Sequence, residues 1–342
     1  MRKLFKFGVL TLSIFIFSAC GQSKDEEIIN IYSHRHYKAD DHLFSKFTEQ
    51  TGVKVNIVQA SADELMQRMV NEGENSPADI LFTVDAGRLY RAQSLGLFQP
   101  IQSDILDENI PVHLKEKENH WYGITYRARI IAVSKDRVNA DSIKTYQDLT
   151  DPQWKGKILV RSSDNVYNQS LLASMIINEG EAAAEAWAAG IVANMARNPK
   201  GSDRDQVKAV AAGEGDIAIV NTYYVGLLLN AQNEEDRKAG EAVTIIFPDQ
   251  EGNGTHINVS GVGVAKHAPN KDNAIKFIEY LSGIEAQEIL TNLNFEFPAN
   301  PKAEKAALIQ SWGDFKTDTM DLYKMGEYNS EAVKIFDRVG WN

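Results

Sequence analysis

The sequence predicts an α/β protein with two lobes, and three observations support this fold class. Short apolar runs rich in β-branched residues alternate with segments of helical spacing, which is typical of mainly parallel sheets flanked by helices. Two long extended segments, residues 121–134 and 256–265, are suited to carry the chain between two sheets. About 320 residues remain after a short leader, a length that suits two domains rather than one.

The first residues have the pattern of a processing signal. Basic residues precede an apolar run that extends through Phe17, and Ser-Ala-Cys follows at 18–20. A run of about 13 apolar positions is too short for an ordinary membrane-spanning helix. We therefore predict a signal peptide at residues 1–19 and a polar tether at residues 20–27. The mature chain is then expected outside the cytoplasm, in the periplasm or at the cell surface.

The only cysteine, Cys20, lies at the end of this leader. Ser-Ala-Cys-Gly resembles the lipobox of bacterial lipoproteins, which implies lipid attachment at Cys20 and a membrane anchor; soluble export is the alternative. A single cysteine excludes an internal disulfide. Removing residues 1–19 takes away three positive charges and no acidic residue, so the formal net charge changes from −11 to −14. An acidic chain of this kind argues against nucleic acid as a partner and mildly favours a cationic ligand.

Local signals place the elements of the first part of the chain. Ser61 and Glu64 have capping-box spacing, and a later helix is expected to end at Gly96. Apolar β-branched runs predict the strands. The expected strands are residues 28–33, 53–58, 79–84 and the extended segment 121–134, and the expected helices are residues 41–50, 61–71 and the segment that ends at Gly96.

The second part of the chain continues the alternation. Pro152 and Gly156 bracket a turn before a strand, and Asp203 is suited to cap a helix. The expected strands are residues 157–160, 216–220, 243–247 and the returning segment 256–265, and the expected helices are residues 166–178, 181–195, 203–212 and 222–232, followed by C-terminal helices that a Pro-rich segment at 297–301 interrupts. This order assigns residues 28–127 and 256–342 to lobe 1 and residues 128–255 to lobe 2.

Two adjacent tyrosines, Tyr223 and Tyr224, follow the short strand predicted at residues 216–220. Asn221 and Thr222 interrupt the apolar run and are suited to cap the next helix. The carboxyl ends of strands in open α/β sheets face the ligand crevice, so two phenol oxygens there would suit a hard metal ion. The competing interpretation is that both rings pack in the core.

Several separate segments resemble the iron-binding proteins of bacterial ABC importers, the transferrin-like group with the type II periplasmic-binding-protein fold. They are PADILFTVDAGRLYRAQSLGLFQP at 77–100, DPQWKGKI at 151–158, NTYYVG at 221–226 and EFPANP at 296–301. In addition, IYSHRHY at 31–37 and RSSDNVYNQSL at 161–171 resemble the subgroup with a first-lobe His-Tyr pair and an extra second-lobe tyrosine. The resemblance implies two mixed, mainly parallel sheets flanked by helices and joined by two hinge strands.

The resemblance also implies a set of metal ligands, with one basic residue beside the metal. The ligands are His36, Tyr37, Tyr167, Tyr223 and Tyr224. Arg127 is the basic residue that could stabilise a phenolate or hold an anion, and an ordinary salt-bridged arginine is the alternative. The implied cargo is iron, with Fe³⁺ preferred over Fe²⁺, and five candidate ligands make a synergistic anion such as carbonate unnecessary. The implied protein is a monomeric binding protein that serves an ABC permease, and it is not an enzyme.

The chemistry of these residue types suits ferric ion. Fe³⁺ is small and hard and prefers anionic oxygen to thiolate. A free phenol has a pKa of about 10, so the metal must displace the proton, and binding should release protons and weaken in acid. Three phenolates match the trivalent charge and four leave a net charge of minus one, whereas a neutral imidazole adds no charge.

Two other classes of protein remain as alternatives. A binding protein of the same fold for an organic cation such as a polyamine would use the aromatic residues as stacking walls and would need carboxylates in the cleft. An exported hydrolase would need a nucleophile and a base, but the sequence has no G-x-S-x-G elbow, no H-E-x-x-H motif and no P-loop. His34 and His36, two residues apart, also suggest zinc, although few other histidines have a suitable spacing.

Overall fold

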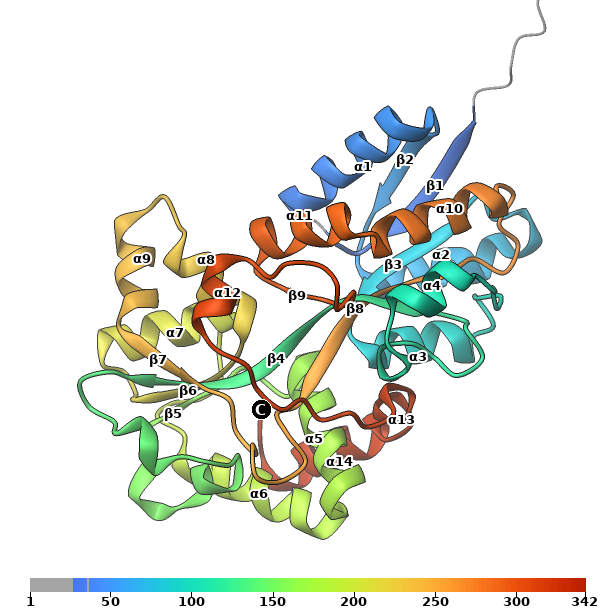
Figure 1. Ribbon diagram of the computed structural model, residues 1–342. Coiled ribbons are helices and arrows are strands. Elements are labelled where there is room, and N and C mark those ends of the chain that lie inside the picture. Colours follow the sequence, from blue (N-terminus) through green and yellow to red (C-terminus); the bar gives the residue numbers. More distant parts are fainter. Residues whose placement is uncertain (1–26, 36) are drawn as a thin grey trace, which may run out of the picture.

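The computed structural model describes residues 27–35 and 37–342, which form two lobes built from strands and covering helices (Figure 1). The predicted signal peptide, the lipid attachment at Cys20 and the predicted ligand His36 lie outside the described residues. In the part of the chain that is described, no helix has both the length and the apolar character needed to cross a membrane.

The strands of both lobes form one hydrogen-bonded path, in the order β2-β1-β3-β8-β4-β6-β5, with β7 and β9 also paired to β4. The strands are β1 (Ile28–Ser33), β2 (Lys54–Gln59), β3 (Ile80–Val84), β4 (Tyr122–Ser134), β5 (Ile158–Leu159), β6 (Ile217–Asn221), β7 (Val243–Ile246), β8 (Ile257–Val264) and β9 (Phe297–Pro298). Each of the predicted strands is present, with ends that differ from the prediction by at most one residue, because buried β-branched runs define strands well.

Strand β4 extends through both lobes (Figure 1). Its first half pairs with β8 in lobe 1 as far as Ala128, opposite Ile257. From Arg129 onward it pairs with β6, and then with β7, in lobe 2. The two extended segments predicted to join the lobes are therefore β4 and β8, and the chain crosses between the lobes where Ala128 faces Ile257.

The sheet is mixed, as expected, but the expectation of mainly parallel pairing is wrong. Pairing is parallel only for β1 with β2, β1 with β3, and β5 with β6. The pairs that involve β4 or β8 are all antiparallel. The reason is that β8 enters lobe 1, and β4 enters lobe 2, at the side where the neighbouring strands β3 and β6 end, so each runs against its neighbour.

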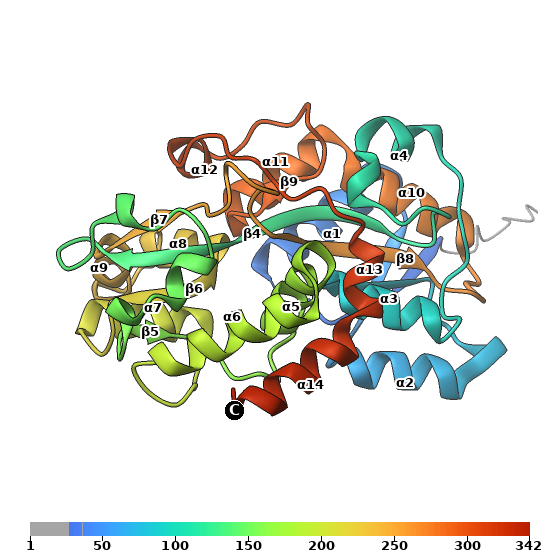
Figure 2. The same cartoon turned by 90° about the horizontal axis from the view of Figure 1, so that it is seen from below.

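Helices cover the sheet of each lobe (Figures 1 and 2). The helices are α1 (Lys38–Thr51), α2 (Ala62–Glu72), α3 (Ala86–Ser94), α4 (Asp104–Asn109), α5 (Val166–Glu179), α6 (Glu181–Asn194), α7 (Asp203–Ala212), α8 (Thr222–Leu229), α9 (Glu234–Glu241), α10 (Lys271–Ser282), α11 (Ile284–Asn294), α12 (Ala307–Ser311), α13 (Leu322–Glu327) and α14 (Asn329–Val339).

Two of the capping predictions can be compared with the helix starts. The capping box is confirmed at α2, where the Ser61 side chain accepts from the Glu64 backbone N–H and the Glu64 side chain accepts from the Ser61 N–H. The prediction that Asp203 caps the next helix is wrong by one position. Ser202 is the N-cap, and Asp203 is the first residue of α7, with its carboxylate directed into a buried ion pair with Arg129.

The C-terminal helix α14 departs from the predicted lobe assignment. Residues 256–342 were assigned to lobe 1, but α14 packs against α5 and α6 (Figure 2). Its apolar stripe of Ala332, Ile335 and Phe336 belongs to the core of lobe 2. The helix before it, α13, contacts both α3 in lobe 1 and α5 in lobe 2. The last part of the chain therefore crosses from lobe 1 to lobe 2, where the apolar stripe of α14 is buried in the core.

Candidate metal centre

A cleft of about 480 Å³ lies between the lobes. Tyr37 and Val84 line it from lobe 1, and Tyr167, Tyr223 and Tyr224 line it from lobe 2. Residues predicted as ligands from three distant parts of the sequence therefore meet in one cavity. The family resemblance implies that these residues share one site, and strand ends are where open α/β sheets bind ligands.

Each tyrosine stands where a strand gives way to a helix. Tyr37 is the N-cap residue of α1, shortly after β1. Tyr167 is the second residue of α5, whose N-cap Asn165 accepts a hydrogen bond from the Tyr167 backbone N–H. Tyr223 and Tyr224 open α8 directly after β6. Because helix N-termini carry partial positive charge, these positions favour groups that become anionic.

The four rings lie close together in the cleft. The Oη atoms of Tyr167 and Tyr223 are 3.3 Å apart. The ring centroids of Tyr223 and Tyr224 are 4.1 Å apart, and those of Tyr37 and Tyr223 are 6.3 Å apart, in edge-to-face arrangement. Tyr37 comes from lobe 1 and Tyr223 from lobe 2, so the lobes lie in an arrangement that already brings the two halves of the site together.

Burial makes these phenols reluctant to ionise without a metal. Tyr223 is only 1% exposed, and desolvation, followed by the neighbouring phenols of Tyr167 and Tyr37, raises its pKa well above the ordinary value. Desolvation is also the largest cause that raises the pKa of Tyr37 and of Tyr224. These three phenols are therefore neutral at pH 7, and a cation that binds them must displace their protons.

Arg127 lies on β4 beside the tyrosines. It is 1% exposed, its Nη1 donates to Ser260 Oγ at 3.0 Å, and its Cζ is 5.5 Å from the centroid of the Tyr167 ring. Glu296 lies 3.8 Å from Nη1, so Arg127 is also part of an ion pair. Within the described residues its Nε and Nη2 have no hydrogen-bond partner. Arg127 therefore combines both interpretations, since it is a salt-bridged arginine with N–H groups left to stabilise a phenolate.

Sequence reasoning missed a second arginine and its partner, Arg35 and Glu296. The Cζ of Arg35 lies 4.6 Å from the Tyr37 ring centroid, and its guanidinium pairs with Asp40 at 2.8 Å and with Glu296 at 3.4 Å. Burial alone would raise the pKa of Glu296, but Arg35 and Arg127 outweigh it and hold that pKa below its usual range. Glu296 thus pairs with both arginines, the one against Tyr37 and the one against Tyr167. The only signal was that both residues fall inside segments that carry the family resemblance.

Tyr126, the residue before Arg127, packs against Phe297 and does not line the cleft. Its ring stacks on Phe297 with centroids 5.1 Å apart and planes 16° apart. Desolvation, then Asp314, raises the pKa of Tyr126 to about 12. Tyr126 is therefore part of the contact between β4 and β9, and not a fifth phenol of the site.

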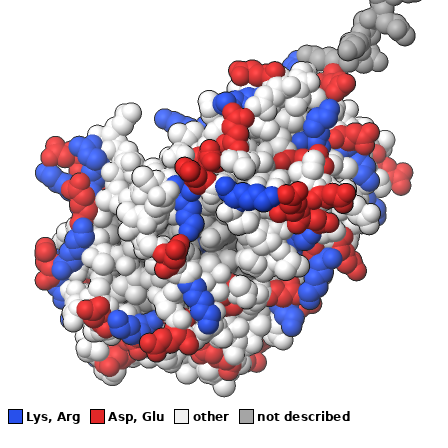
Figure 3. All heavy atoms as spheres, in the orientation of Figure 1, with Lys and Arg blue, Asp and Glu red and all other residues white. Residues whose placement is uncertain are grey.

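The charged side chains described in the cleft wall are all basic. The basic residues in its wall are Arg35, Lys38, Arg88, Arg161 and Arg204, and none of the described residues in the wall is acidic. By contrast, the face of the molecule in Figure 3 carries acidic and basic side chains interspersed. An organic cation such as a polyamine would need carboxylates in the cleft, so this lining argues against that alternative.

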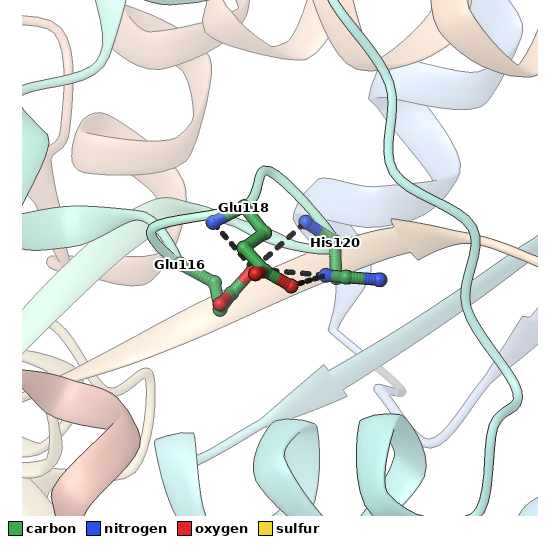
Figure 4. A group of neighbouring side chains, drawn as sticks. All are labelled: Glu116, Glu118 and His120. Carbon is green, nitrogen blue, oxygen red and sulfur yellow. Dashed lines mark hydrogen bonds and ion pairs between the residues drawn. The ribbon is translucent and has the colours of Figure 1, made fainter.

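A second group of metal-type donors lies away from the cleft, in the loop before β4 (Figure 4). The side chains of Glu116, Glu118 and His120 lie close together there. Oε2 of Glu116 accepts hydrogen bonds from the backbone N–H groups of Glu118 and His120, at 3.0 and 3.1 Å, and lies 3.1 Å from Nδ1 of His120. These contacts close a tight turn, and they account for the cluster without a metal.

The chain was compared with known families, proteins and structures. A family of bacterial extracellular solute-binding proteins matches residues 75–317. Iron uptake protein A1 of Synechocystis sp. is 47% identical over 335 residues, which cover 95% of this chain and 93% of that protein.

Solved structures agree with the sequence comparison. The Trichodesmium protein (IdiA) (FutA), in complex with iron and citrate ligands, matches with a TM-score of 0.89 and 48% identity, over 92% of this chain and 100% of that one. The ferric binding protein of Campylobacter jejuni matches with a TM-score of 0.87 and 47% identity, also over 92% of this chain and 100% of that one.

Proposed function

Because the chain belongs to the bacterial extracellular solute-binding proteins, we propose that it captures iron outside the cytoplasm and delivers it to an ABC permease. Fe³⁺ is the cargo, and the cleft between the lobes is its binding site. Relatives are named as an iron uptake protein and as ferric iron-binding proteins, and proteins of this family are solute-binding proteins of transport systems.

One observation carries the proposal: phenol groups from both lobes converge in one buried cleft. Tyr37 approaches from lobe 1, and Tyr167, Tyr223 and Tyr224 approach from lobe 2, with Tyr167 and Tyr223 in direct contact through their oxygens. Core packing alone would not require hydroxyl groups at these positions. Hard anionic oxygen is what Fe³⁺ prefers, and His36, beside Tyr37 in the sequence, would add a neutral nitrogen ligand.

The proposed ligand set also explains the arginines. Four phenolates around Fe³⁺ leave a net charge of minus one, which is costly in a buried site. Arg35 and Arg127 each lie against a ligand ring, at 4.6 Å from Tyr37 and 5.5 Å from Tyr167. They would stabilise the phenolates without touching the metal. With this shell we expect no requirement for a synergistic anion, and Fe²⁺ stays a weaker alternative because it matches fewer phenolates.

The location and the partners of the protein follow from the same assignment. Family members of this kind are extracytoplasmic. We propose that Cys20 carries a lipid that anchors the chain to a membrane, on the basis of the leader pattern. We further propose that the protein works as a monomer, that its closed form is the one the permease recognises, and that it catalyses no reaction.

The test is an absorption titration of a soluble protein, residues 21–342, with chelated ferric iron. Iron on phenolate oxygen should produce a broad visible charge-transfer band that saturates at one equivalent. Tyr126→Phe is the matched control, since Tyr126 stacks on Phe297 outside the cleft wall and should leave the band unchanged. Absence of any band, together with no rise in thermal stability on addition of iron, would overturn the proposal and direct the search to other ligands.

A further inference from the structure

Asp85 occupies an unusual position beside the cleft, one residue after Val84 in its wall. It is the N-cap of α3, directly after β3, and its neighbour Val84 lines the cleft. The side chain is fully buried, and the backbone has φ 83° and ψ 128°. A residue with a side chain rarely adopts such a positive φ, and the conformation persists only where the surroundings hold it in place.

Three elements hold the Asp85 carboxylate. Oδ1 accepts from the Gly87 backbone N–H at 2.9 Å and from Ser170 Oγ at 2.8 Å. Oδ2 accepts from Asn258 Nδ2 at 2.7 Å, and Oδ1 of Asn258 in turn accepts from the Ala86 N–H at 2.8 Å. The carboxylate therefore joins α3 in lobe 1 to the hinge strand β8 and to α5 in lobe 2.

The Ser170 contact crosses between the lobes. Ser170 lies on α5 three residues after Tyr167, so both side chains project from the same side of that helix. Gly87 leaves room for the approach, because a Cβ at this position would lie 3.2 Å from Asp85 Oδ1 and 3.9 Å from Ser170 Oγ. The hydrogen bond thus ties the helix that carries a cleft tyrosine to a buried residue of the other lobe.

Charge connects the same carboxylate to the tyrosine site. Burial raises the pKa of Asp85, and Arg127 is the largest influence that opposes this rise. Arg127 is also the guanidinium that lies against the Tyr167 ring. Asp85 is therefore connected to Tyr167 in two ways. One is the charge of Arg127 on β4, and the other is α5, which carries both Ser170 and Tyr167.

We propose that Asp85 is a positioning residue and that its hydrogen bond to Ser170 is an interlobe latch, which stabilises the arrangement in which Tyr167 and Tyr37 face the same cleft. The inference rests on the proposed function, because the latch matters only if these tyrosines bind a shared ion. The latch forms when α5 and α3 stand as they do here, with Tyr37 and Tyr223 side by side. Loss of the latch favours opening of the cleft, and it leaves the iron ligands themselves in place.

The experiment measures release of Fe³⁺ from soluble protein (residues 21–342) to excess EDTA, followed through the charge-transfer band. Ser170→Ala removes the hydroxyl and keeps the helix, and it should release iron about tenfold faster, since a hydrogen bond to a buried charged group is lost. The band should keep its wavelength, because every ligand remains. Asp85→Asn is a second variant, which keeps the shape and tolerates positive φ, and it should act in the same direction.

Ser174→Ala is the matched control on the same helix. Ser174 is also buried, but its Oγ donates to the Leu171 carbonyl, and this hydrogen bond stays within α5. Faster release in Ser170→Ala alone supports the latch. Release at the wild-type rate in Ser170→Ala, or equal acceleration in both serine variants, overturns it and leaves the iron site standing. Absence of the band in the unsubstituted protein overturns the proposed function and this inference together.

Discussion

Two regions of the molecule gather metal-type donors, and they differ in what those donors already do. In the turn of Glu116, Glu118 and His120, the buried carboxylate of Glu116 is occupied by two backbone N–H groups and a histidine ring. In the cleft, the phenol oxygens of Tyr167 and Tyr223 lie 3.3 Å apart. The two residues are on different helices, α5 and α8, which are distant in the sequence.

The contrast teaches that proximity of donors is a weak sign of a metal site. The turn groups residues that are two and four positions apart in the sequence, so local hydrogen bonding explains their closeness. The cleft groups tyrosines from three elements of two lobes, α1, α5 and α8, and hydroxyl groups are buried there with protons that a cation can displace. A site for iron needs donors that the fold brings together and that local structure has not used.

The largest expected effect is that of pH on iron affinity. Burial raises the pKa of Tyr37, Tyr223 and Tyr224, so these groups carry their protons throughout the range from about pH 5 to pH 8. Each must release one proton on binding, so affinity should fall about tenfold per pH unit for each tyrosine ligand as pH decreases.

Competition against a chelator of known pH dependence measures this slope. A site built from carboxylates, as in the turn, would release no protons near neutral pH. A slope near zero would therefore place the iron away from the tyrosines.

The next effect is that of Tyr223→Phe, which removes the central oxygen and keeps the ring that packs against Phe297 and Ile309. Loss of partners that only support a ligand typically weakens metal binding about 10- to 100-fold, so loss of a ligand should cost at least about 100-fold. A chelator competition assay gives the affinity, and circular dichroism checks the fold. Wild-type affinity in this variant would remove Tyr223 from the ligand set.

Arg127→Met should have an intermediate effect, because it removes the charge that lies against Tyr167 and leaves every ligand oxygen. We expect affinity to fall about tenfold, with the charge-transfer band shifted but still present. Arg91→Met is the control, since Arg91 forms an exposed pair with Asp63 and is not among the residues that line the cleft. An equal loss in both variants would indicate a general effect of net charge.

His36→Ala should weaken iron binding less than the loss of any tyrosine ligand. A neutral imidazole supplies a nitrogen but no charge, and the phenolates carry the charge match to Fe³⁺. Titration of the variant beside Tyr223→Phe measures the ranking directly. A loss as large as that of Tyr223→Phe would show that nitrogen ligation matters as much as anionic oxygen.

The smallest expected effect is that of Glu118→Gln, in the turn. Glu118 is exposed and the turn is held by Glu116, so iron affinity and the stoichiometry of one should stay unchanged. Iron bound per protein, measured after gel filtration, checks this outcome. A drop in bound iron would mean that the turn binds the metal and would reverse the comparison.

Local patterns predicted most of the secondary structure, since strands at 28–33 and 216–220 are marked by β-branched runs and the Ser61 capping box by its own spacing. The same patterns placed Tyr37, Tyr167 and the Tyr223–Tyr224 pair at strand ends. They did not predict the extent of antiparallel pairing or the position of α14. Both depend on how distant segments pack, and the preference of a single segment carries no such information.

The sequence by itself determined the residue types of the candidate site, its paired tyrosines and the acidic, single-cysteine character of the exported chain. The tertiary structure decided which charges surround those tyrosines. Arg35 and Glu296 are 261 residues apart, and Asp85 and Ser170 are 85 apart, yet both pairs form buried contacts. Such contacts follow from the crossing of β4 and β8 between the lobes, which brings groups together that no local spacing relates.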